Sequence, residues 1–330
     1  MEYRALGRTG LRVSALGFGC GNVGGLMIRG APAERERAVA RALELGVTFF
    51  DTAADYGDGL SEQHLGEALR TLRPECVVAT KVRLDPAGLR DPGAAIARSL
   101  DRSLRRLGRE RVDLLQLHNP IRAAPRDGEP AAADVLARIL PAIEALRRAG
   151  KVGFVGITAL GDTPALHAVL DAGAADTAQV CLNLLNPSAA FPVPAGFPAQ
   201  DFGRLAQRAA RAGTGVIVIR ALAGGALSGE LGRHPIAAPG VEPIASGPDY
   251  ATDVARARRL LAAVREGHAG SLVEAALRLP LASPAVSTVL LGYSSLDQLE
   301  TAAAAVRDGP LPAAALARLE RAWSEMAGSR

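Results

Sequence analysis

The sequence predicts an α/β fold, a closed (β/α)8 TIM barrel with a short N-terminal β-hairpin, from three observations. Short runs of Val, Ile and Leu alternate with amphipathic segments, which is typical of repeated strand–helix units. Eight such runs lack polar alternation, as expected for parallel strands covered on both faces. Ionisable side chains stand at the ends of three consecutive runs, where a parallel barrel forms its active site.

The opening of the chain predicts the hairpin. Residues 3–6 and 13–15 flank the turn Gly7-Arg8-Thr9-Gly10, whose glycines favour a tight reversal. Each apolar run that follows is expected to form one barrel strand, with a crossover leading to the next strand. The runs are residues 16–19, 48–51, 77–81, 112–118, 152–158, 178–182, 216–221 and 286–291.

Two amphipathic patterns define the clearest helices. Apolar residues recur at helical spacing over 96–107 and over 136–146. Asp91 or Pro92 is a suitable start for the first helix, and Gly150 a suitable end for the second. A last helix over 312–326 is expected to close one face of the barrel. An open doubly wound sheet is the second architecture considered, but eight strand–helix units favour the closed barrel.

Two proline-rich segments interrupt the repeating pattern. They span residues 186–200 and 228–250, and each follows a predicted strand at the rim that carries the ionisable residues. Long segments of this kind are usually functional or disordered. We interpret them as walls of the substrate and cofactor sites, although a tolerated surface insertion explains the second segment nearly as well.

Composition narrows the class of protein. The 330 residues are 48% hydrophobic, which is enough for one barrel domain over 1–330. Lys+Arg 38 and Asp+Glu 34 nearly balance and alternate along the chain, so nucleic acid is not an expected partner. The N-terminus has no apolar signal region and no apolar stretch reaches the length of a membrane span, which predicts a cytoplasmic protein. The oligomeric state cannot be deduced.

Metal chemistry is not predicted. The three cysteines, Cys20, Cys76 and Cys181, are widely spaced and are expected to be buried, reduced thiols rather than a zinc site. A metal-dependent barrel hydrolase or isomerase would need clustered His and carboxylates at strand ends. Of the five histidines, one stands at a predicted strand end. They are His64, His118, His167, His234 and His268.

Four residues are candidate catalytic groups. Asp51, Lys81 and His118 end three successive apolar runs, and Tyr56 lies in the loop five residues after Asp51. Parallel neighbouring strands would bring all four together at one rim. Each residue alone has a structural explanation, such as a cap, a packed ring or a solvent-exposed amine. The combination favours a functional site.

The chemistry of such a cluster is proton transfer. A phenol has a pKa near 10, and an ammonium about 4 Å away contributes roughly 4 kcal/mol, or at most about three pKa units. Asp51 would hold Lys81 charged, and His118 would offer a ring N–H to a substrate oxygen or relay a proton. The site could then protonate an oxygen whose carbon receives a hydride. A hydride donor such as a nicotinamide or flavin would be required.

Longer motifs surround these four residues. They are Gly17-Phe18-Gly19, Asp51-Thr52-Ala53, Tyr56-Gly57, Ser61-Glu62, Leu65-Gly66-Glu67-Ala68-Leu69, Thr80-Lys81, and residues 113–118, 150–158 and 179–186. Together they resemble the motifs of the aldo-keto reductase superfamily over nearly the whole chain. The resemblance implies a (β/α)8 barrel that reduces carbonyls with NAD(P)H. It also implies that Tyr56 is the general acid, that Lys81 and Asp51 tune it, and that His118 positions the carbonyl.

The same resemblance implies a set of cofactor-binding positions. Their expected partners are the nicotinamide carboxamide, the nicotinamide ribose, the pyrophosphate and the adenosine phosphate. Thr158 and Gln179 are expected at the nicotinamide carboxamide, and Gly19 and Cys20, close to Asp51, at the nicotinamide ribose. Leu222 and Gly224, with Arg220, are expected at the pyrophosphate, and Ser294 and Gln298 at the adenosine phosphate.

The sequence also departs from the family pattern. Ala159 stands where Asn is usual, Ile219 replaces an aromatic ring, and Arg220 replaces a Ser. Arg220 would contact the pyrophosphate or point away into a structural ion pair. Ser294 replaces a common Arg or Lys, and Ala302 a common Asn. NADP(H) is the more favoured cofactor on family grounds, and NAD(H) is possible because Ser294 supplies no charge.

These observations predict an NAD(P)H-dependent oxidoreductase that interconverts a small-molecule carbonyl and its alcohol. A cofactor-binding regulatory protein on the same fold, with little turnover, is the alternative. The pocket walls are predicted to be mainly apolar, which argues against a small, highly charged substrate. Sugars, steroids, quinones and pyridoxal-like aldehydes all remain open. The expected wall residues are Val23, Leu26, Met27, Leu84, Ile121 and Phe191.

Overall fold

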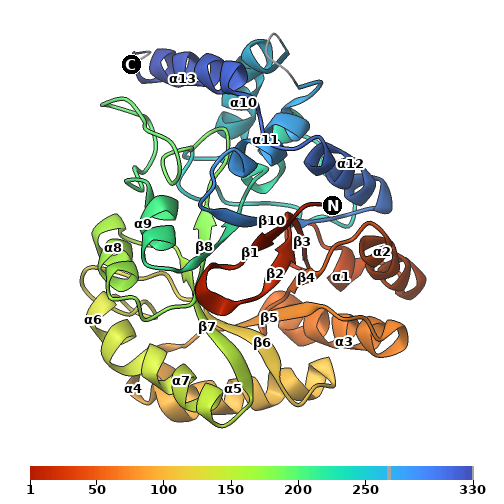
Figure 1. The fold of residues 1–330 in the computed structure, drawn as a ribbon, viewed down its shortest axis with the longest axis vertical. Helices are drawn as coiled ribbons and strands as arrows, with labels where there is room; N and C mark the ends of the chain where they lie inside the picture. The colour runs from red at the N-terminus through yellow and green to blue at the C-terminus, as the bar shows by residue number, and fades with distance from the viewer. Residues whose placement is uncertain (266–268, 329–330) are drawn as a thin grey trace.

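The computed structural model, which describes residues 1–265 and 269–328, is a closed barrel of parallel strands surrounded by helices (Figure 1). Around the barrel the strands follow the order β10-β3-β4-β5-β6-β7-β8-β9, so the predicted barrel is confirmed. The barrel strands are β3 (Leu16–Gly19), β4 (Phe49–Asp51), β5 (Val77–Val82), β6 (Val112–Leu117), β7 (Val152–Ala159), β8 (Thr177–Cys181), β9 (Gly215–Ile219) and β10 (Val286–Gly292).

The helices lie outside the strands. They are α1 (Leu26–Arg29), α2 (Pro32–Glu44), α3 (Leu60–Leu72), α4 (Pro86–Arg90), α5 (Pro92–Leu107), α6 (Ala132–Asp134), α7 (Leu140–Arg148), α8 (Thr163–Asp171), α9 (Leu205–Arg211), α10 (Tyr250–Arg265), α11 (Leu272–Leu281), α12 (Leu296–Arg307) and α13 (Ala313–Gly328). Four short helical turns complete the set. They are η1 (Gly7–Thr9), η2 (Tyr56–Gly59), η3 (Val135–Ile139) and η4 (Ala223–Ser228).

The ends of α5 show how local sequence sets an element. The Asp91 carboxylate accepts a hydrogen bond from the backbone N–H of Ala94, and Pro92 occupies the first turn, where no N–H is needed. Gly108 ends the helix with a left-handed φ of 64°. The predicted start at Asp91 or Pro92 is therefore confirmed.

The interior of the barrel is layered. Because successive side chains on a strand point to opposite faces, residues two apart share one face. The lower layer is apolar and fully buried; its members are Leu6, Val13, Phe49, Ala79, Leu114 and Ile217. Two residues further along three of these strands stand Asp51, Lys81 and Gln116, also buried. The barrel thus carries a polar upper layer on an apolar floor.

The N-terminal hairpin forms that floor. Strands β1 (Tyr3–Ala5) and β2 (Arg12–Ser14) pair antiparallel and are drawn in front of the barrel in Figure 1. Gly7 has a φ of +53°, and a Cβ there would lie 2.2 Å from the backbone nitrogen of Gly215. A side chain at this position would therefore prevent the hairpin from seating on β9.

The C-terminal helix forms as predicted, but it packs at a different place from the predicted one. Helix α13 packs against α10, and the indole N–H of Trp323 donates to the carbonyl of Leu184, 2.9 Å away. It thus holds the segment after β8, whereas the hairpin closes the barrel floor. That segment is itself anchored, because the Asn186 side-chain amide donates to the carbonyls of Gln200 and Ala245.

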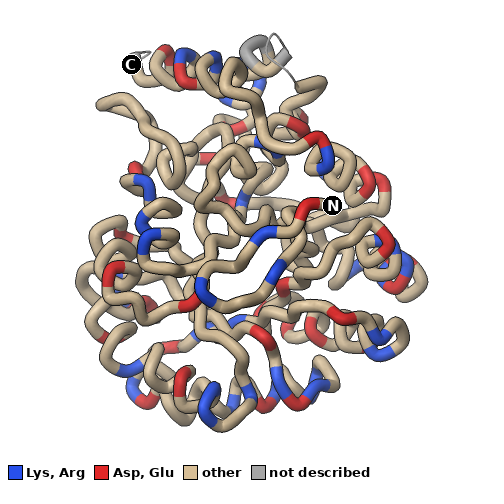
Figure 2. Tube along the Cα trace, viewed as in Figure 1, with Lys and Arg blue, Asp and Glu red and all other residues tan. Residues whose placement is uncertain are grey.

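Charges on the surface are mixed. In the view of Figure 2, Lys and Arg residues alternate with Asp and Glu residues along the outer helices. Many form ion pairs, such as Arg41 with Glu44 and Glu300. Within residues 1–265 and 269–328, no helix combines the length and apolarity that a bilayer crossing requires.

Candidate active site

The four predicted catalytic side chains meet at the upper end of the barrel. Asp51 ends β4, Lys81 lies near the end of β5, and His118 directly follows β6. Tyr56 begins the turn η2 in the loop after β4. The Lys81 ammonium donates to the Asp51 carboxylate, to the Thr52 carbonyl at 2.8 Å and to the Tyr56 hydroxyl at 3.2 Å.

Asp51 and Lys81 form a buried ion pair. Their side chains are 2% and 1% exposed. The second carboxylate oxygen of Asp51 accepts hydrogen bonds from the side-chain amides of Gln116 at 3.2 Å and Gln179 at 2.6 Å. Burial opposes the charge on Lys81, but the Asp51 carboxylate outweighs it and holds the pKa of Lys81 above its ordinary value. Lys81 is thus a fixed cation.

Tyr56 is a protonated phenol at neutral pH. Burial raises its pKa, and the nearby Lys81 ammonium offsets only part of that rise. The net shift is therefore opposite to the lowering expected from Lys81 alone. A phenol that keeps its proton is the form that can donate to a carbonyl oxygen. Its ring packs beside Gly21, where a Cβ would lie 3.4 Å from the ring.

The turn after Tyr56 depends on unusual backbone geometry. Gly57 and Asp58 have φ values of 57° and 53°, in the left-handed region. The Gly57 N–H donates to the side-chain oxygen of Asn22 at 3.1 Å, which ties this turn to the loop after β3. The turn thereby fixes the direction in which the Tyr56 side chain leaves the backbone.

His118 has two neighbours that sequence reasoning missed. Its Nδ1 lies 3.1 Å from a carboxylate oxygen of Asp55, and the same oxygen lies 3.1 Å from Nε of Arg83. The His118 and Tyr56 rings meet edge to face, with centroids 5.7 Å apart. Burial lowers the pKa of His118, and Asp55 offsets part of that effect. The position of Asp55, directly before Tyr56, was the available signal.

The residues expected at the nicotinamide also lie together. Thr158 and Gln179 pair in register on β7 and β8, close to Asp51. The Thr158 hydroxyl is buried and has no partner in the described structure. A buried hydroxyl of this kind fits a bound amide group. Gly19 ends β3, and the backbone N–H of Cys20 donates to the Asp51 carbonyl at 2.9 Å.

Arg220 lies just beyond β9, beside the predicted pyrophosphate turn. It has a φ of 58°, and its guanidinium donates to the Glu242 carbonyl at 3.2 Å. Leu222 precedes turn η4, and a Cβ on Gly224 would lie 3.1 Å from the Arg220 guanidinium. Arg220 therefore points along the rim towards Gly224 and the 228–250 segment. Burial lowers its pKa.

The 228–250 segment is anchored to the loop after β3. The Arg233 guanidinium donates to the carbonyls of Ala238 at 2.6 Å and Gly224 at 2.8 Å, and the Ala238 N–H donates to the Val23 carbonyl at 3.1 Å. Arg29 adds a bond to the Ile236 carbonyl at 2.6 Å. These contacts favour a wall of the site over a free surface insertion.

The residues expected at the adenosine phosphate are already bonded to the protein. The Ser294 hydroxyl donates to the Gly24 carbonyl at 2.6 Å, and the side-chain oxygen of Gln298 accepts from the Ser294 N–H at 2.8 Å. Ser294 is also buried. Because a hydroxyl has one proton to donate, Ser294 has none left for a phosphate.

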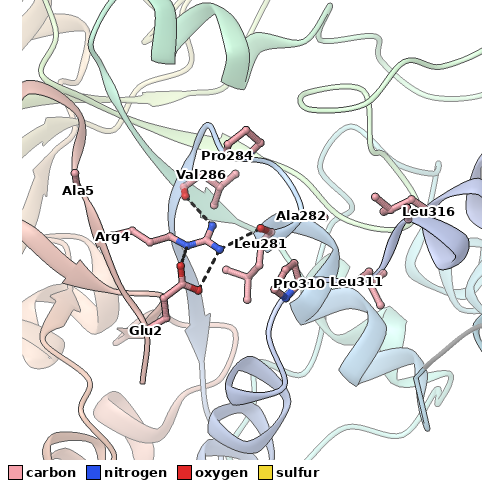
Figure 3. Close-up of a pocket in the computed structure, with 11 residues that line it drawn as sticks. Glu2, Arg4, Ala5, Leu281, Ala282, Pro284, Val286, Pro310, Leu311 and Leu316 are labelled. Atoms are coloured by element: carbon pink, nitrogen blue, oxygen red, sulfur yellow. Dashed lines mark hydrogen bonds and ion pairs between the residues drawn. The ribbon is translucent and has the colours of Figure 1, made fainter.

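A groove of about 580 Å³ lies elsewhere, beside strand β1, the end of α11 and the start of α13 (Figure 3). Arg4 lines the groove, and its guanidinium donates hydrogen bonds to the Glu2 carboxylate and to the carbonyls of Val286 and Leu281. None of the four candidate catalytic residues borders this groove. Within the described residues there is no group of three or more His, Cys, Asp or Glu suited to a metal; His268 lies outside them.

The comparisons with known proteins identify the family. A model of the aldo/keto reductase family matches residues 15–324. The chain belongs to this family. This aldo/keto reductase is 32% identical over 314 residues to L-galactose dehydrogenase of Arabidopsis thaliana, covering 93% of this chain and 89% of that protein.

Two further likenesses span almost the whole aldo/keto reductase chain. Pyridoxal 4-dehydrogenase of Microbacterium luteolum is 28% identical over 329 residues, covering 90% of this chain and 91% of the relative. Among solved structures, the holo form of the aldo-keto reductase AKR11C1 from Bacillus halodurans superposes with a TM-score of 0.71 at 28% identity, covering 99% and 96% of the two chains. The chain is therefore an oxidoreductase of this family.

Proposed function

We propose that this aldo/keto reductase interconverts a small-molecule carbonyl and its alcohol with a nicotinamide dinucleotide, and that Tyr56 is its general acid and base. The observation that carries the proposal is the contact between the Tyr56 hydroxyl and the Lys81 ammonium, 3.2 Å apart. A protonated phenol next to a fixed cation can donate its proton to a developing alkoxide, because the cation stabilises the phenolate that remains.

The surrounding residues prepare Tyr56 for this role. Asp51 keeps Lys81 charged and in place, and Gln116 and Gln179 hold the carboxylate through its other oxygen. In carbonyl reduction the Tyr56 proton moves to the substrate oxygen. In alcohol oxidation the phenolate takes the hydroxyl proton. The Asp51–Lys81 pair is buried, so bulk water does not weaken the field of the ammonium at the half-buried Tyr56 hydroxyl.

The residues at the rim fit a nicotinamide dinucleotide, which supplies or accepts the hydride when bound. Among the residues that the structure describes, the buried Thr158 hydroxyl has no partner, and it lies beside Gln179, which suits a carboxamide. Arg220 and the turn with Leu222 and Gly224 offer donors for a pyrophosphate. The preference for NADP(H) over NAD(H) rests on family likeness, and Ser294 adds no support because its hydroxyl is already used.

The names of two relatives support a proposal for the substrate class. One is named a dehydrogenase of L-galactose and another a dehydrogenase of pyridoxal. We propose an uncharged sugar or a pyridoxal-like aldehyde as substrate. Of the expected wall residues, Leu26 and Met27 in helix α1 and Ile121 after β6 belong to the buried core, so the substrate proposal rests on the relatives.

The regulatory alternative is less well supported. A protein that only senses cofactor occupancy needs the cofactor contacts but no proton donor. Here the proton donor, the cation and the carboxylate are joined by direct hydrogen bonds. This connected set of hydrogen bonds favours an enzyme that turns over its substrate.

The test replaces the phenol. Tyr56→Phe should bind NADH or NADPH with unchanged affinity, measured by nucleotide fluorescence, and should lose roughly 10²- to 10⁴-fold in kcat with L-galactose or pyridoxal. Tyr3→Phe is the matched control, because the Tyr3 hydroxyl bonds the Gly46 carbonyl on the surface. Retained turnover in Tyr56→Phe would remove Tyr56 from the acid–base role.

A further inference from the structure

Two consecutive polar residues at the start of α3, Ser61 and Glu62, are fully buried. They form one of the sequence motifs near Tyr56, but the proposed proton transfer gives them no role. Burying a carboxylate costs free energy unless the group is paired and hydrogen-bonded. The contacts of these two side chains therefore indicate what they contribute to the site.

Glu62 holds the end of β5 from outside the barrel. Its carboxylate accepts a hydrogen bond from the Thr80 hydroxyl at 2.5 Å. Thr80 directly precedes Lys81 on the strand, and successive side chains of a strand point to opposite faces. The hydroxyl therefore faces α3, while the ammonium faces the barrel interior. Glu62 thus anchors the residue next to the one that carries the ammonium.

Ser61 holds the end of β4 in the same way. Its hydroxyl donates to the Cys20 carbonyl at 2.9 Å, so it accepts from the Thr52 hydroxyl, 2.7 Å away. Thr52 directly follows Asp51 in the sequence. The first turn of α3 therefore bonds to the sequence neighbours of both members of the buried ion pair.

Arg106 on α5 completes this arrangement. Its Nε donates to the other carboxylate oxygen of Glu62 at 2.7 Å, which supplies the countercharge for a carboxylate that is 0% exposed. The same side chain packs over Gly59, where a Cβ would lie 2.7 Å from Cδ of Arg106. Gly59 ends the turn η2, which begins at Tyr56. The Glu62–Arg106 ion pair thus contacts the turn that carries the phenol and, through Thr80, the strand that carries the ammonium.

The distance between these two elements matters for the chemistry. The Lys81 ammonium lies 3.2 Å from the Tyr56 hydroxyl. At an effective dielectric near 20, a retreat of about 1 Å weakens this interaction by roughly one pKa unit. A misplacement of that size can cost up to about a hundredfold in rate. A small shift of β5 against η2 is therefore enough to slow proton transfer.

We propose that Ser61 and Glu62 are positioning residues, and that the Glu62–Arg106 ion pair sets the approach of Lys81 to Tyr56 from outside the barrel. The assignment rests on the proposed function and deepens it, because it names what fixes the contact between the phenol and the ammonium. It also gives the Ser61-Glu62 motif a physical role, since a buried carboxylate can join a hydroxyl on one element to a guanidinium on another.

The kinetic test replaces the hydroxyl that Glu62 holds. Thr80→Val keeps the size and the branched shape of the side chain but removes the donor. It should lower kcat by about ten- to a hundredfold with L-galactose or pyridoxal, and should leave the Kd of NADPH and of NADH within about twofold. Thr80→Ser keeps the hydroxyl and should retain at least about a third of the wild-type kcat.

A second variant and a matched control separate positioning from stability. Arg106→Lys keeps a positive charge beside Glu62 but loses the guanidinium geometry, and it should also lower kcat without weakening the cofactor. Thr214→Val removes another buried hydroxyl, one that donates to the Ala175 carbonyl at 2.9 Å. Thr214 directly precedes β9, at the end of the barrel opposite the site. Its variant should lower the Tm about as much as Thr80→Val does and keep the wild-type kcat.

A spectroscopic readout does not depend on turnover. The lysines of the chain are Lys81 and Lys151, and the Lys151 side chain is 42% exposed. Lysine labelled with nitrogen-15 at the side chain therefore reports on Lys81, with Lys151→Arg providing the assignment. Tyr56→Phe should shift the Lys81 signal, because it removes the hydroxyl beside the ammonium. In a Thr80→Val background this shift should fall by at least about half, and in a Thr214→Val background it should be unchanged.

Four results would overturn the proposal. They are a kcat of Thr80→Val within about twofold of the wild type, an equal loss of kcat in Thr214→Val, no recovery of kcat in Thr80→Ser, and a Tyr56→Phe shift of the Lys81 signal that Thr80→Val leaves unchanged. Failure of the proposed function has a different signature. Tyr56→Phe would then retain turnover, or no aldehyde or sugar would react, while the Lys81 signal would still report its contact with Tyr56.

Discussion

The Lys81→Met substitution removes a buried ammonium and leaves the Asp51 carboxylate facing an apolar side chain. Both charges are at most 2% exposed, so the unpaired carboxylate cannot recover its hydration. At an effective dielectric near 20, two charges in contact interact by roughly 4 kcal/mol. Removing one member of a buried pair typically costs about 3–5 kcal/mol. Gln116 and Gln179 still donate hydrogen bonds to Asp51. The expected loss of folding stability therefore lies at the lower end of this range.

This loss translates into a measurable change in melting temperature. An unfolding entropy of roughly 2.1 cal/mol/K per residue, over 330 residues, gives about 0.7 kcal/mol/K. A loss of about 3–4 kcal/mol should therefore lower the Tm by roughly 4–6 °C, followed by circular dichroism at a fixed scan rate. Asp51→Asn should give a similar drop, since it leaves the ammonium unpaired.

The double variant Asp51→Asn/Lys81→Met decides whether charge pairing is the cause. It contains no unpaired buried charge, so its Tm should lie well above the value expected from adding the two single losses. If the losses simply add, the two side chains do not depend on each other, and the account of Lys81 as a cation held by Asp51 is wrong.

Two further predictions concern the cofactor and the thiols. Ser294→Arg should tighten NADPH binding relative to NADH by roughly ten- to a hundredfold in fluorescence titrations, because a guanidinium adds a charged donor for the 2′-phosphate. Ser294→Ala should leave that ratio unchanged, since the native hydroxyl is bonded to Gly24; a large change would show that it reaches the nucleotide. Burial raises the pKa of Cys76 to about 11 and that of Cys181 to about 12, so at pH 8 both should remain thiols. Ellman's reagent should label half-buried Cys76 slowly and Cys181 after unfolding, and rapid native labelling of Cys181 would contradict its burial.

Strand order and the meeting of Asp51, Lys81 and His118 were predictable from sequence because they depend on local pattern. Parallel strands of similar length end at one rim, so residues that close successive apolar runs become neighbours. Strand ends were less certain: His118 and Arg220 lie just past β6 and β9 rather than within them. Those boundaries depend on hydrogen bonds between neighbouring strands.

Contacts between loops were not predictable. The approach of Asp55 to Arg83 and His118 joins three loops whose geometry is set by the barrel. The destination of the Ser294 hydroxyl depends on Gly24, which is 270 residues away in sequence. The net direction of the Tyr56 pKa shift depends on how completely the ring is buried, a property of the whole rim.

The N-terminal hairpin has a consequence for how the chain is made. The Arg8 N–H donates to the Gly213 carbonyl at 2.7 Å, and the Arg4 guanidinium reaches the Val286 carbonyl at 3.1 Å. During translation the hairpin residues are made about 200 residues before Gly213, so their docking surface does not exist when they leave the ribosome. Leu6 and Val13 remain uncovered in that interval, so nascent chains stalled before residue 213 should be the forms that recruit chaperones.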